Sequence, residues 1–333
     1  MRGALASGVI AILLATATVV AAQGTASPAP SAAQGDFAGL VDIGGRRLYM
    51  ECQGTGSPTV VLEAGGFARG DYWTRDLHEP AGRRQMVLPA VAGFTHVCTY
   101  DRPGTVSDPD PGADQGGPDF LPSRSDPVPM PRTAREIVPE LHALLQTAGV
   151  PGPYVLVGHS IGGIFVRLYA SAYPDEVVGM VLVDATPEDV WLQFQAALTP
   201  TQWEAFERVQ FSMEPNDEYP ALERLDQQAI VAQMREVQAA TPLRPMPLAV
   251  LAHGIPFDPP TPDWPTEATE QIMLDTERNL ATLVPNARFS VASQSGHNIH
   301  QDQPALVTEA IRQVVSGVRD RDTWYDLAAC CAN

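Results

Sequence analysis

The sequence predicts an α/β fold, in which helices cover both faces of a mostly parallel β-sheet. Three features of the 333-residue chain lead to this prediction. Short apolar segments rich in Val, Leu and Tyr recur along the chain, as buried strands do. Helical patterns, with apolar residues three and four positions apart, separate several of these segments. One strand-like segment also runs through a glycine and a serine directly into a helix, within residues 154–173.

The expected elements follow one another in a regular order. The strands are expected at residues 47–52, 59–63, 96–100, 154–158, 179–184, 247–252 and 287–292. The clearest helices are expected at residues 133–148, 161–173 and 304–316, with Thr133 as an N-cap of the first. No internal repeat is apparent. Strands that alternate with helices in this way pair mostly in parallel within one sheet.

Two segments interrupt the alternation. Residues 105–131 are dense in Pro, Asp, Gly and Ser and are expected to form a long loop. Residues 187–243 are expected to form a small helical cap inserted between two core strands. Their aromatic residues stand at broadly helical spacing; they are Trp191, Phe194, Trp203, Phe206, Phe211 and Tyr219. Such a cap would roof a site and create an apolar pocket.

The core is expected in residues 40–186 and 244–318, on either side of the cap. Residues 1–22 combine one early positive charge, an apolar run and small residues at its end, which is the pattern of a secretory signal peptide. An uncleaved membrane anchor is the alternative, since the run is almost long enough to span a bilayer. Residues 23–39 form a linker of small residues and residues 319–333 a C-terminal tail. The mature protein is therefore expected to be secreted and to have no stable membrane insertion.

The composition limits the partners of the protein. The formal net charge is −18 at pH 7, with 44% hydrophobic residues. This acidic balance argues against nucleic acid or an anionic membrane as a partner. No C-x-x-C motif or His/Cys cluster indicates a zinc site. The sequence is silent on the oligomeric state.

The segment GHSIGG at residues 158–163 ends a predicted strand and begins a helix. A G-x-S-x-G motif in this setting is a nucleophile elbow, which makes Ser160 the candidate nucleophile. The sharp turn crowds the backbone, and Gly158 and Gly162 remove Cβ atoms that would clash there. The helix N-terminus beneath the serine can stabilise a developing oxyanion. The backbone N–H of Ile161 is the natural first donor.

With three further segments, this motif resembles the α/β-hydrolase fold superfamily over residues 40–318. The segments are VVLEAGGF (residues 60–67), YDRPG (residues 100–104) and SGH (residues 295–297). The LEAG form of the first segment is most similar to exported bacterial members. The resemblance implies an eight-stranded sheet in the order 1-2-4-3-5-6-7-8, with strand 2 antiparallel. Segments 47–52 and 96–100 are then the neighbouring strands 2 and 4.

That neighbourhood implies a disulfide between Cys52 and Cys98. Two free buried thiols are the alternative. The adjacent Cys330 and Cys331 could pair with each other or with another chain, or stay free.

The resemblance also supplies a base and an acid for the serine. It places the base after the last strand, at His297, with His300 as the rival. The acid follows either strand 6, at Asp184, or strand 7, at Asp258; we prefer Asp184, although the order Ser…Asp…His holds for both. The other histidines are expected to pack in the core or lie on the surface; they are His78, His96, His142, His159 and His253.

The loop after strand 3 is expected to complete the oxyanion hole, through the N–H of Gly66 beside that of Ile161. Two adjacent glycines would let this loop approach the substrate closely. Glu63, a carboxylate near the end of a buried strand, is expected to pair with a basic or polar group. Asp101 and Arg102 are expected to brace the loop.

Together these residues predict a serine hydrolase that cleaves a small-molecule carboxylic ester through an acyl-enzyme. No metal or organic cofactor is needed for this chemistry. An amidase or exopeptidase of the same fold is the alternative, and a non-catalytic binding protein is a third. The sequence does not indicate the natural substrate.

Overall fold

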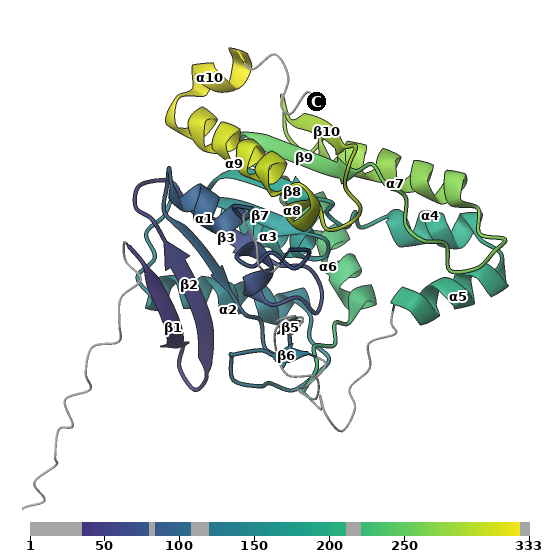
Figure 1. Cartoon of the computed structure of the whole chain (residues 1–333), viewed down its shortest axis with the longest axis horizontal. Coiled ribbons are helices and arrows are strands. Elements are labelled where there is room, and N and C mark those ends of the chain that lie inside the picture. The colour runs from purple at the N-terminus through teal and green to yellow at the C-terminus, as the bar shows by residue number, and fades with distance from the viewer. Residues whose placement is uncertain (1–34, 80–83, 108–119, 211–220, 327–333) are drawn as a thin grey trace, which may run out of the picture.

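The structure is a computed structural model that describes residues 35–79, 84–107, 120–210 and 221–326 (Figure 1). The predicted signal peptide and most of the predicted linker lie outside these ranges. So do four of the residues singled out above, which are Phe211, Tyr219, Cys330 and Cys331. Within the described ranges, none of the helices has the length and apolar character needed to cross a membrane.

Eight strands form one sheet in the order β1-β2-β4-β3-β7-β8-β9-β10. They are β1 (Phe37–Asp42), β2 (Arg47–Gln53), β3 (Thr59–Glu63), β4 (Val97–Tyr100), β7 (Tyr154–His159), β8 (Val177–Val183), β9 (Leu248–His253) and β10 (Arg288–Ala292). Strand β2 is antiparallel to both of its neighbours, and the remaining pairs are parallel. The predicted order and the antiparallel second strand are confirmed. The core begins at Phe37, within the predicted linker and before the predicted boundary at residue 40.

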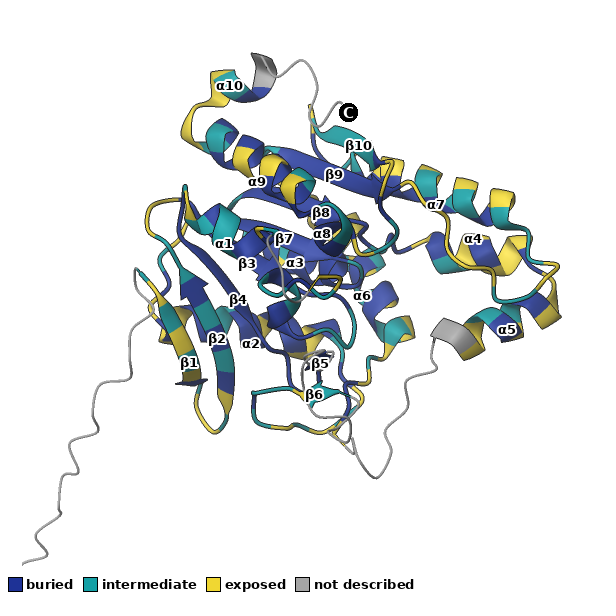
Figure 2. Ribbon diagram, viewed as in Figure 1, coloured by how far each residue is buried: buried dark blue, intermediate teal, exposed yellow. Residues whose placement is uncertain are grey.

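Helices cover both faces of the sheet, as predicted (Figure 1). One face is covered by α1 (Val87–Ala92) and α9 (Pro304–Arg319), and the other by α2 (Ala134–Thr147), α3 (Gly162–Ala172) and α6 (Gln227–Ala240). Alternate side chains of one strand point to opposite faces of the sheet. Val155 and Val157 of β7 pack in the hydrophobic cluster that includes α9, whereas Leu156 packs in the cluster that includes α3. The central strands are accordingly buried along their length, whereas exposed residues lie on the outer sides of the helices, on β1 and in the loops (Figure 2).

The remaining elements are short or lie at the rim of the sheet. They are η1 (Gly70–Trp73), β5 (Val106–Ser107), β6 (Leu121–Pro122), α4 (Val190–Ala197), α5 (Pro200–Gln210), α7 (Thr266–Leu280), α8 (Ile299–Asp302) and α10 (Arg321–Asp326). The predicted loop at residues 105–131 contains the small antiparallel pair β5–β6. Thr133 caps α2 in a capping box with Glu136, which confirms its predicted role.

The helical cap differs from its predicted extent of residues 187–243. Among the described helices of that segment, α4 and α5 build the roof, whereas α6 packs on α2 and α3 and adds Ile230 and Met234 to the core. The roof is completed from beyond β9, where Trp264 and Met273 pack against the aromatic residues of α4 and α5. Figure 1 shows α4, α5 and α7 together on the side of the molecule opposite β1.

Cys52 and Cys98 form a disulfide between β2 and β4, where they are directly opposite each other in register. Both residues are buried. The pairing implied by the resemblance is therefore present in the structure.

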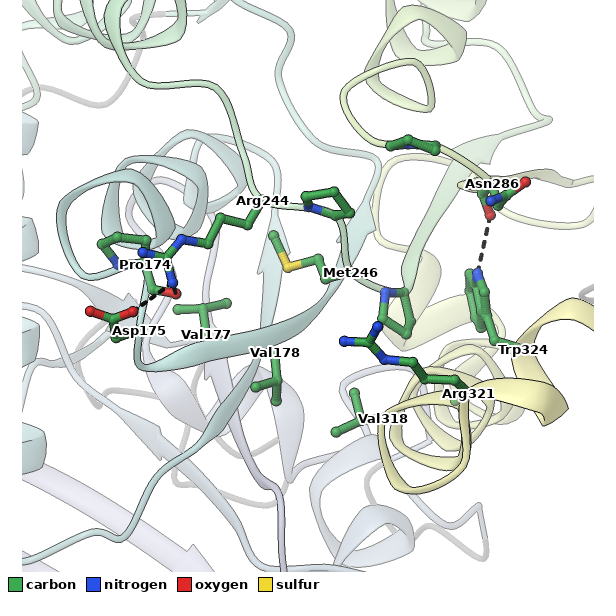
Figure 3. Close-up of a pocket in the computed structure, with 14 residues that line it drawn as sticks. Pro174, Asp175, Val177, Val178, Arg244, Met246, Asn286, Val318, Arg321 and Trp324 are labelled. Carbon is green, nitrogen blue, oxygen red and sulfur yellow. Dashed lines mark hydrogen bonds and ion pairs between the residues drawn. The ribbon is translucent and has the colours of Figure 1, made fainter.

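A cavity of about 320 Å³ opens where β8 and β9 begin, between Met246, Val318 and Trp324 (Figure 3). Arg244 at this cavity pairs with Asp175 at 2.5 Å. None of the predicted catalytic residues lines it. In parallel α/β sheets, ligands bind at the carboxyl ends of the strands, which is the opposite end of β8 and β9.

Candidate active site

Ser160 sits on a strained corner between β7 and α3. Its φ is +53°, in the left-handed region that residues other than glycine rarely adopt. A Cβ atom at Gly158 would lie 2.7 Å from the carbonyl oxygen of Gly162, and one at Gly162 would lie 2.6 Å from that of Ala64. These two positions therefore require glycine for the steric reason that the sequence predicted.

Asp184 is the residue immediately after β8, next to the elbow in the sheet. The N–H of Ser160 donates to the carbonyl oxygen of Val183 at 3.2 Å, so the ends of β7 and β8 are tied together. Asp184 is buried, and its Oδ2 lies 2.6 Å from Nδ1 of His297. The two residues are 113 positions apart in the chain.

Asp258, the other predicted acid, is exposed on the loop that follows β9. It lines the same pocket as Ser160 and His297. Within the described part of the chain it makes no hydrogen bond to His297. The geometry thus pairs the imidazole with Asp184 and not with Asp258.

His253, expected to be an ordinary histidine, instead contacts Asp184, the candidate acid. Its backbone N–H and its Nδ1 both lie 2.7 Å from Oδ1 of Asp184, and its Nε2 lies 2.8 Å from Oε2 of Glu270. Burial opposes a positive charge on His253, but the hydrogen bonds to these two carboxylates outweigh burial and raise the pKa of the imidazole to about 10. A signal for this residue was present: His253 ends β9, beside the end of β8 in the sheet.

The charges in this cluster are set by its hydrogen bonds. Burial works against ionisation of Asp184, but the bonds from His253 and His297 outweigh burial and hold the pKa of its carboxyl below the ordinary value. Burial and the charge of Asp184 raise the pKa of the Glu277 carboxyl well above its usual range. Donor atoms of Asp184, His253 and Glu277 lie within 4.8 Å of one another, a spacing that could hold a cation. Because Asp184 and His253 already bond to each other, we interpret them as a hydrogen-bonded pair with Glu277 beside it.

His159, which precedes Ser160, and His300, three residues after His297, face other partners. Burial lowers the pKa of His159 to about 3, so its neutral ring donates from Nε2 to the carbonyl oxygen of His297 at 3.0 Å. This is the packing role predicted for His159, and it also supports the backbone of the candidate base. His300 is buried, with its ring centroid 4.6 Å from Trp73 and 4.4 Å from His159. It does not line the pocket that contains Ser160.

A buried ionic network holds the loop after β3. The guanidinium of Arg102 donates to Oε1 of Glu63 at 2.5 Å and to the carbonyl oxygens of Ala64 and Gly65 at 2.8 and 2.6 Å. It also donates to both carboxylate oxygens of Glu223, at 2.8 and 2.9 Å. Glu63 thus has the basic partner that was predicted for it, and Arg102 braces the loop. Sequence reasoning missed Glu223, which belongs to the segment before α6.

Asp101 braces the same region from the other side. Its Oδ1 accepts from the N–H of Gly70 at 3.0 Å, and its carboxylate also accepts from the guanidinium of Arg124 at 2.7 and 2.8 Å.

The braced loop leaves two backbone donors beside the serine. The N–H of Phe67 is engaged, since it donates to Oε2 of Glu223 at 2.8 Å. The N–H groups of Gly66 and Ile161 donate to no other described residue, and both residues line the pocket with Ser160. These are the two positions predicted for the oxyanion hole.

Two pockets meet at Ser160 and His297. The larger, of about 340 Å³, is roofed by aromatic residues from the cap and the segment after β9, which are Trp191, Phe194, Phe206, Phe257 and Trp264. The smaller, of about 200 Å³, lies toward Tyr72, Val106 and Asn298. Gly66 and Phe67 border both pockets. The site is therefore open on both sides of the serine.

Comparison with known proteins agrees with this architecture. The model of the alpha/beta hydrolase family matches residues 60–310. The chain is 24% identical over 308 residues to an AB hydrolase superfamily protein of Gibberella zeae, covering 79% of this chain and 87% of that protein. The structure of a thermophilic esterase from Thermogutta terrifontis matches with a TM-score of 0.51 and 20% identity, over 85% of this chain and 99% of that one.

Other relatives share only part of their length with this chain. The chain spans 19% of the probable transporter efuK of Hormonema carpetanum and 26% of an uncharacterized protein of Schizosaccharomyces pombe, being 31% identical to each over 156 residues. The family match covers most of the strands and helices described above, including the elbow and His297. This protein belongs to the alpha/beta hydrolase family.

Proposed function

We propose that this hydrolase is a serine esterase that cleaves carboxylic esters through an acyl-enzyme intermediate. The observation that carries the proposal is the 2.6 Å contact between His297 and Asp184, in a pocket shared with Ser160 and two backbone N–H groups that donate to no other described residue. An imidazole oriented by a carboxylate can activate a serine hydroxyl at neutral pH.

The proposed reaction has two halves. His297 takes the proton of Ser160 as the hydroxyl attacks the ester carbonyl, and the N–H groups of Gly66 and Ile161 stabilise the oxyanion. His297 then protonates the leaving alcohol. Water, activated by the same imidazole, hydrolyses the acyl-enzyme and releases the acid. Asp184 orients His297 throughout.

The two pockets favour an ester with a bulky apolar group on one side of the carbonyl and a smaller group on the other. The aromatic pocket of about 340 Å³ supplies apolar surface for the larger group. An exopeptidase is the second candidate, because the exposed carboxylate of Asp258 borders the same pocket and could bind a free α-amino group.

Two measurements test the proposal. A fluorophosphonate probe should label the wild-type protein and fail to label Ser160→Ala. Hydrolysis of p-nitrophenyl esters should exceed that of aminoacyl anilides by a wide margin in kcat/KM. Labelling with hydrolysis of anilides alone would favour the exopeptidase, and absence of labelling would overturn the serine-hydrolase proposal.

We also propose that the protein is exported. The buried disulfide between Cys52 and Cys98 supports this, because disulfides persist mainly outside the reducing cytosol. Sequencing the N-terminus of protein secreted by the host should give a start at Gln23, and recovery of a chain with residues 1–22 intact would contradict cleavage.

A further inference from the structure

Asp184 is held from the side opposite to His297. Its Oδ2 faces His297 at 2.6 Å, while its Oδ1 accepts two hydrogen bonds from His253, one from the backbone N–H and one from the ring, both at 2.7 Å. The backbone N–H of Asp184 donates to the carbonyl oxygen of Leu251 at 2.7 Å. A carboxylate bonded at both oxygens cannot rotate without breaking at least one of these bonds.

His253 is itself held between two carboxylates. Its second ring nitrogen lies 2.8 Å from Oε2 of Glu270, and the other oxygen of Glu270 accepts from the N–H of Phe257 at 3.2 Å. Both ring nitrogens face acceptors, so the imidazole satisfies them only when it carries both protons. Glu277, the third carboxyl near this ring, is buried, and its ligand atom lies within 4.8 Å of those of Asp184 and His253.

We propose that His253, clamped as an imidazolium by Glu270, is a positioning residue that fixes the Asp184 carboxylate so that Oδ2 faces His297. This inference rests on the proposed function of the same site. His253 does not line the substrate pocket, so it acts through Asp184. A misplacement of about 1 Å in a catalytic group can cost roughly a hundredfold in rate.

Two substitutions at position 253 separate the loss of the hydrogen bond to Asp184 from a general loss of folded structure. His253→Ala removes the ring bond to Asp184 and should lower kcat by about a hundredfold, with little change in KM. His253→Asn keeps an N–H donor close to the position of Nδ1 and should recover kcat to within about tenfold of wild type. If His253 had only a structural role, the variants would yield less folded protein, but kcat would not fall more in His253→Ala than in His253→Asn. Circular dichroism identifies any variant that fails to fold.

The charge of the ring is tested without any substrate. In ¹⁵N NMR spectra at pH 8, both side-chain nitrogens of His253 should have the chemical shifts of an imidazolium. Glu270→Gln removes one of the two flanking charges and should move the titration of this ring to lower pH. The matched control is Glu267→Gln, on the same helix but exposed, which should leave the titration and kcat unchanged.

The outcomes distinguish this inference from the proposed function. A neutral His253 at pH 8, or a His253→Ala variant with wild-type kcat, would overturn the positioning role. If the wild-type protein were not labelled by the fluorophosphonate probe, the esterase proposal would fall, and the NMR titration would still report whether Glu270 holds His253 charged.

Discussion

At the scale of single residues, the proposed mechanism requires a carboxylate that orients His297, and Asp184 is in contact with it. Asp184→Asn leaves the size of the side chain unchanged but removes the negative charge that stabilises the imidazolium. We expect kcat for ester hydrolysis to fall by about 10⁴-fold. Asp258→Asn, in the same pocket but without a bond to His297, is the matched control and should lower kcat less than about tenfold. Equal losses in the two variants would show that Asp184 is not the acid.

The raised pKa of His253 also predicts how stability depends on pH. The folded protein holds this proton up to about pH 10, whereas a histidine in the unfolded chain loses it near its ordinary value of 6.5. The stabilisation is therefore complete below about pH 6.5 and is lost as the pH rises toward 10. The other titratable groups that face this ring are the carboxyls of Asp184, Glu270 and Glu277.

We expect the free energy of unfolding, measured by urea denaturation, to fall by up to a few kcal/mol between pH 7 and pH 10. The same measurement on His253→Asn should give a shallower decline over this interval, since that side chain does not titrate. Parallel curves for the two proteins would refute the assignment of the proton to His253.

At the scale of elements, the segment before α6 is joined to the loop after β3 through one side chain. Glu223 bonds to the buried Arg102 and to the N–H of Phe67, next to the proposed oxyanion donor Gly66. The segment before α6 and the loop after β3 therefore depend on each other for their positions. Breaking this link leaves a buried guanidinium with Glu63 as its remaining carboxylate partner.

Glu223→Ala should destabilise the fold by about 3–5 kcal/mol, because it removes one partner of a buried ion pair. It should also lower kcat, since the loop that carries Gly66 loses its anchor. Glu204→Ala, an exposed position on α5, is the control and should change stability by less than about 0.5 kcal/mol. Urea unfolding of the three proteins measures the effect, and a loss in Glu223→Ala no larger than in the control would contradict it.

Elements differ in how well the sequence predicts them, for physical reasons. Buried parallel strands such as β7 and β8 are continuous apolar runs and were predicted within two residues of their bounds. The resemblance implied a first strand, but the residues of β1 were not identified, because it is an edge strand, FAGLVD, with only one buried position. The helix α6 was assigned to the cap because an amphipathic pattern does not say against which surface the apolar side packs.

At the scale of the whole molecule, the candidate site is assembled from the carboxyl ends of adjacent strands. Ser160 follows β7, Asp184 follows β8, and His253 ends β9. The elbow and the position of His297 were predictable because each belongs to a local motif. The bond between His253 and Asp184 joins positions 69 residues apart, and Glu270 enters from a helix packed over the sheet. No local pattern encodes such contacts, so they emerge only from the folded arrangement.

The disulfide acts on the stability of the molecule as a whole. It closes a loop between positions 46 residues apart and joins the antiparallel edge of the sheet to its parallel centre. Restricting the unfolded chain over this length stabilises the fold by about 4 kcal/mol.

The double substitution of Cys52→Ala and Cys98→Ala should therefore lower the midpoint of thermal unfolding by about 10 °C. Both sulfur atoms are buried, so treatment of the native wild-type protein with a reducing agent at 25 °C should have little effect, whereas the same agent during heating should lower the midpoint toward that of the double variant. Calorimetry of the two proteins, with and without reductant, measures both effects. A double variant that unfolds at the wild-type temperature would show that the cross-link adds nothing to the stability already supplied by the packed sheet.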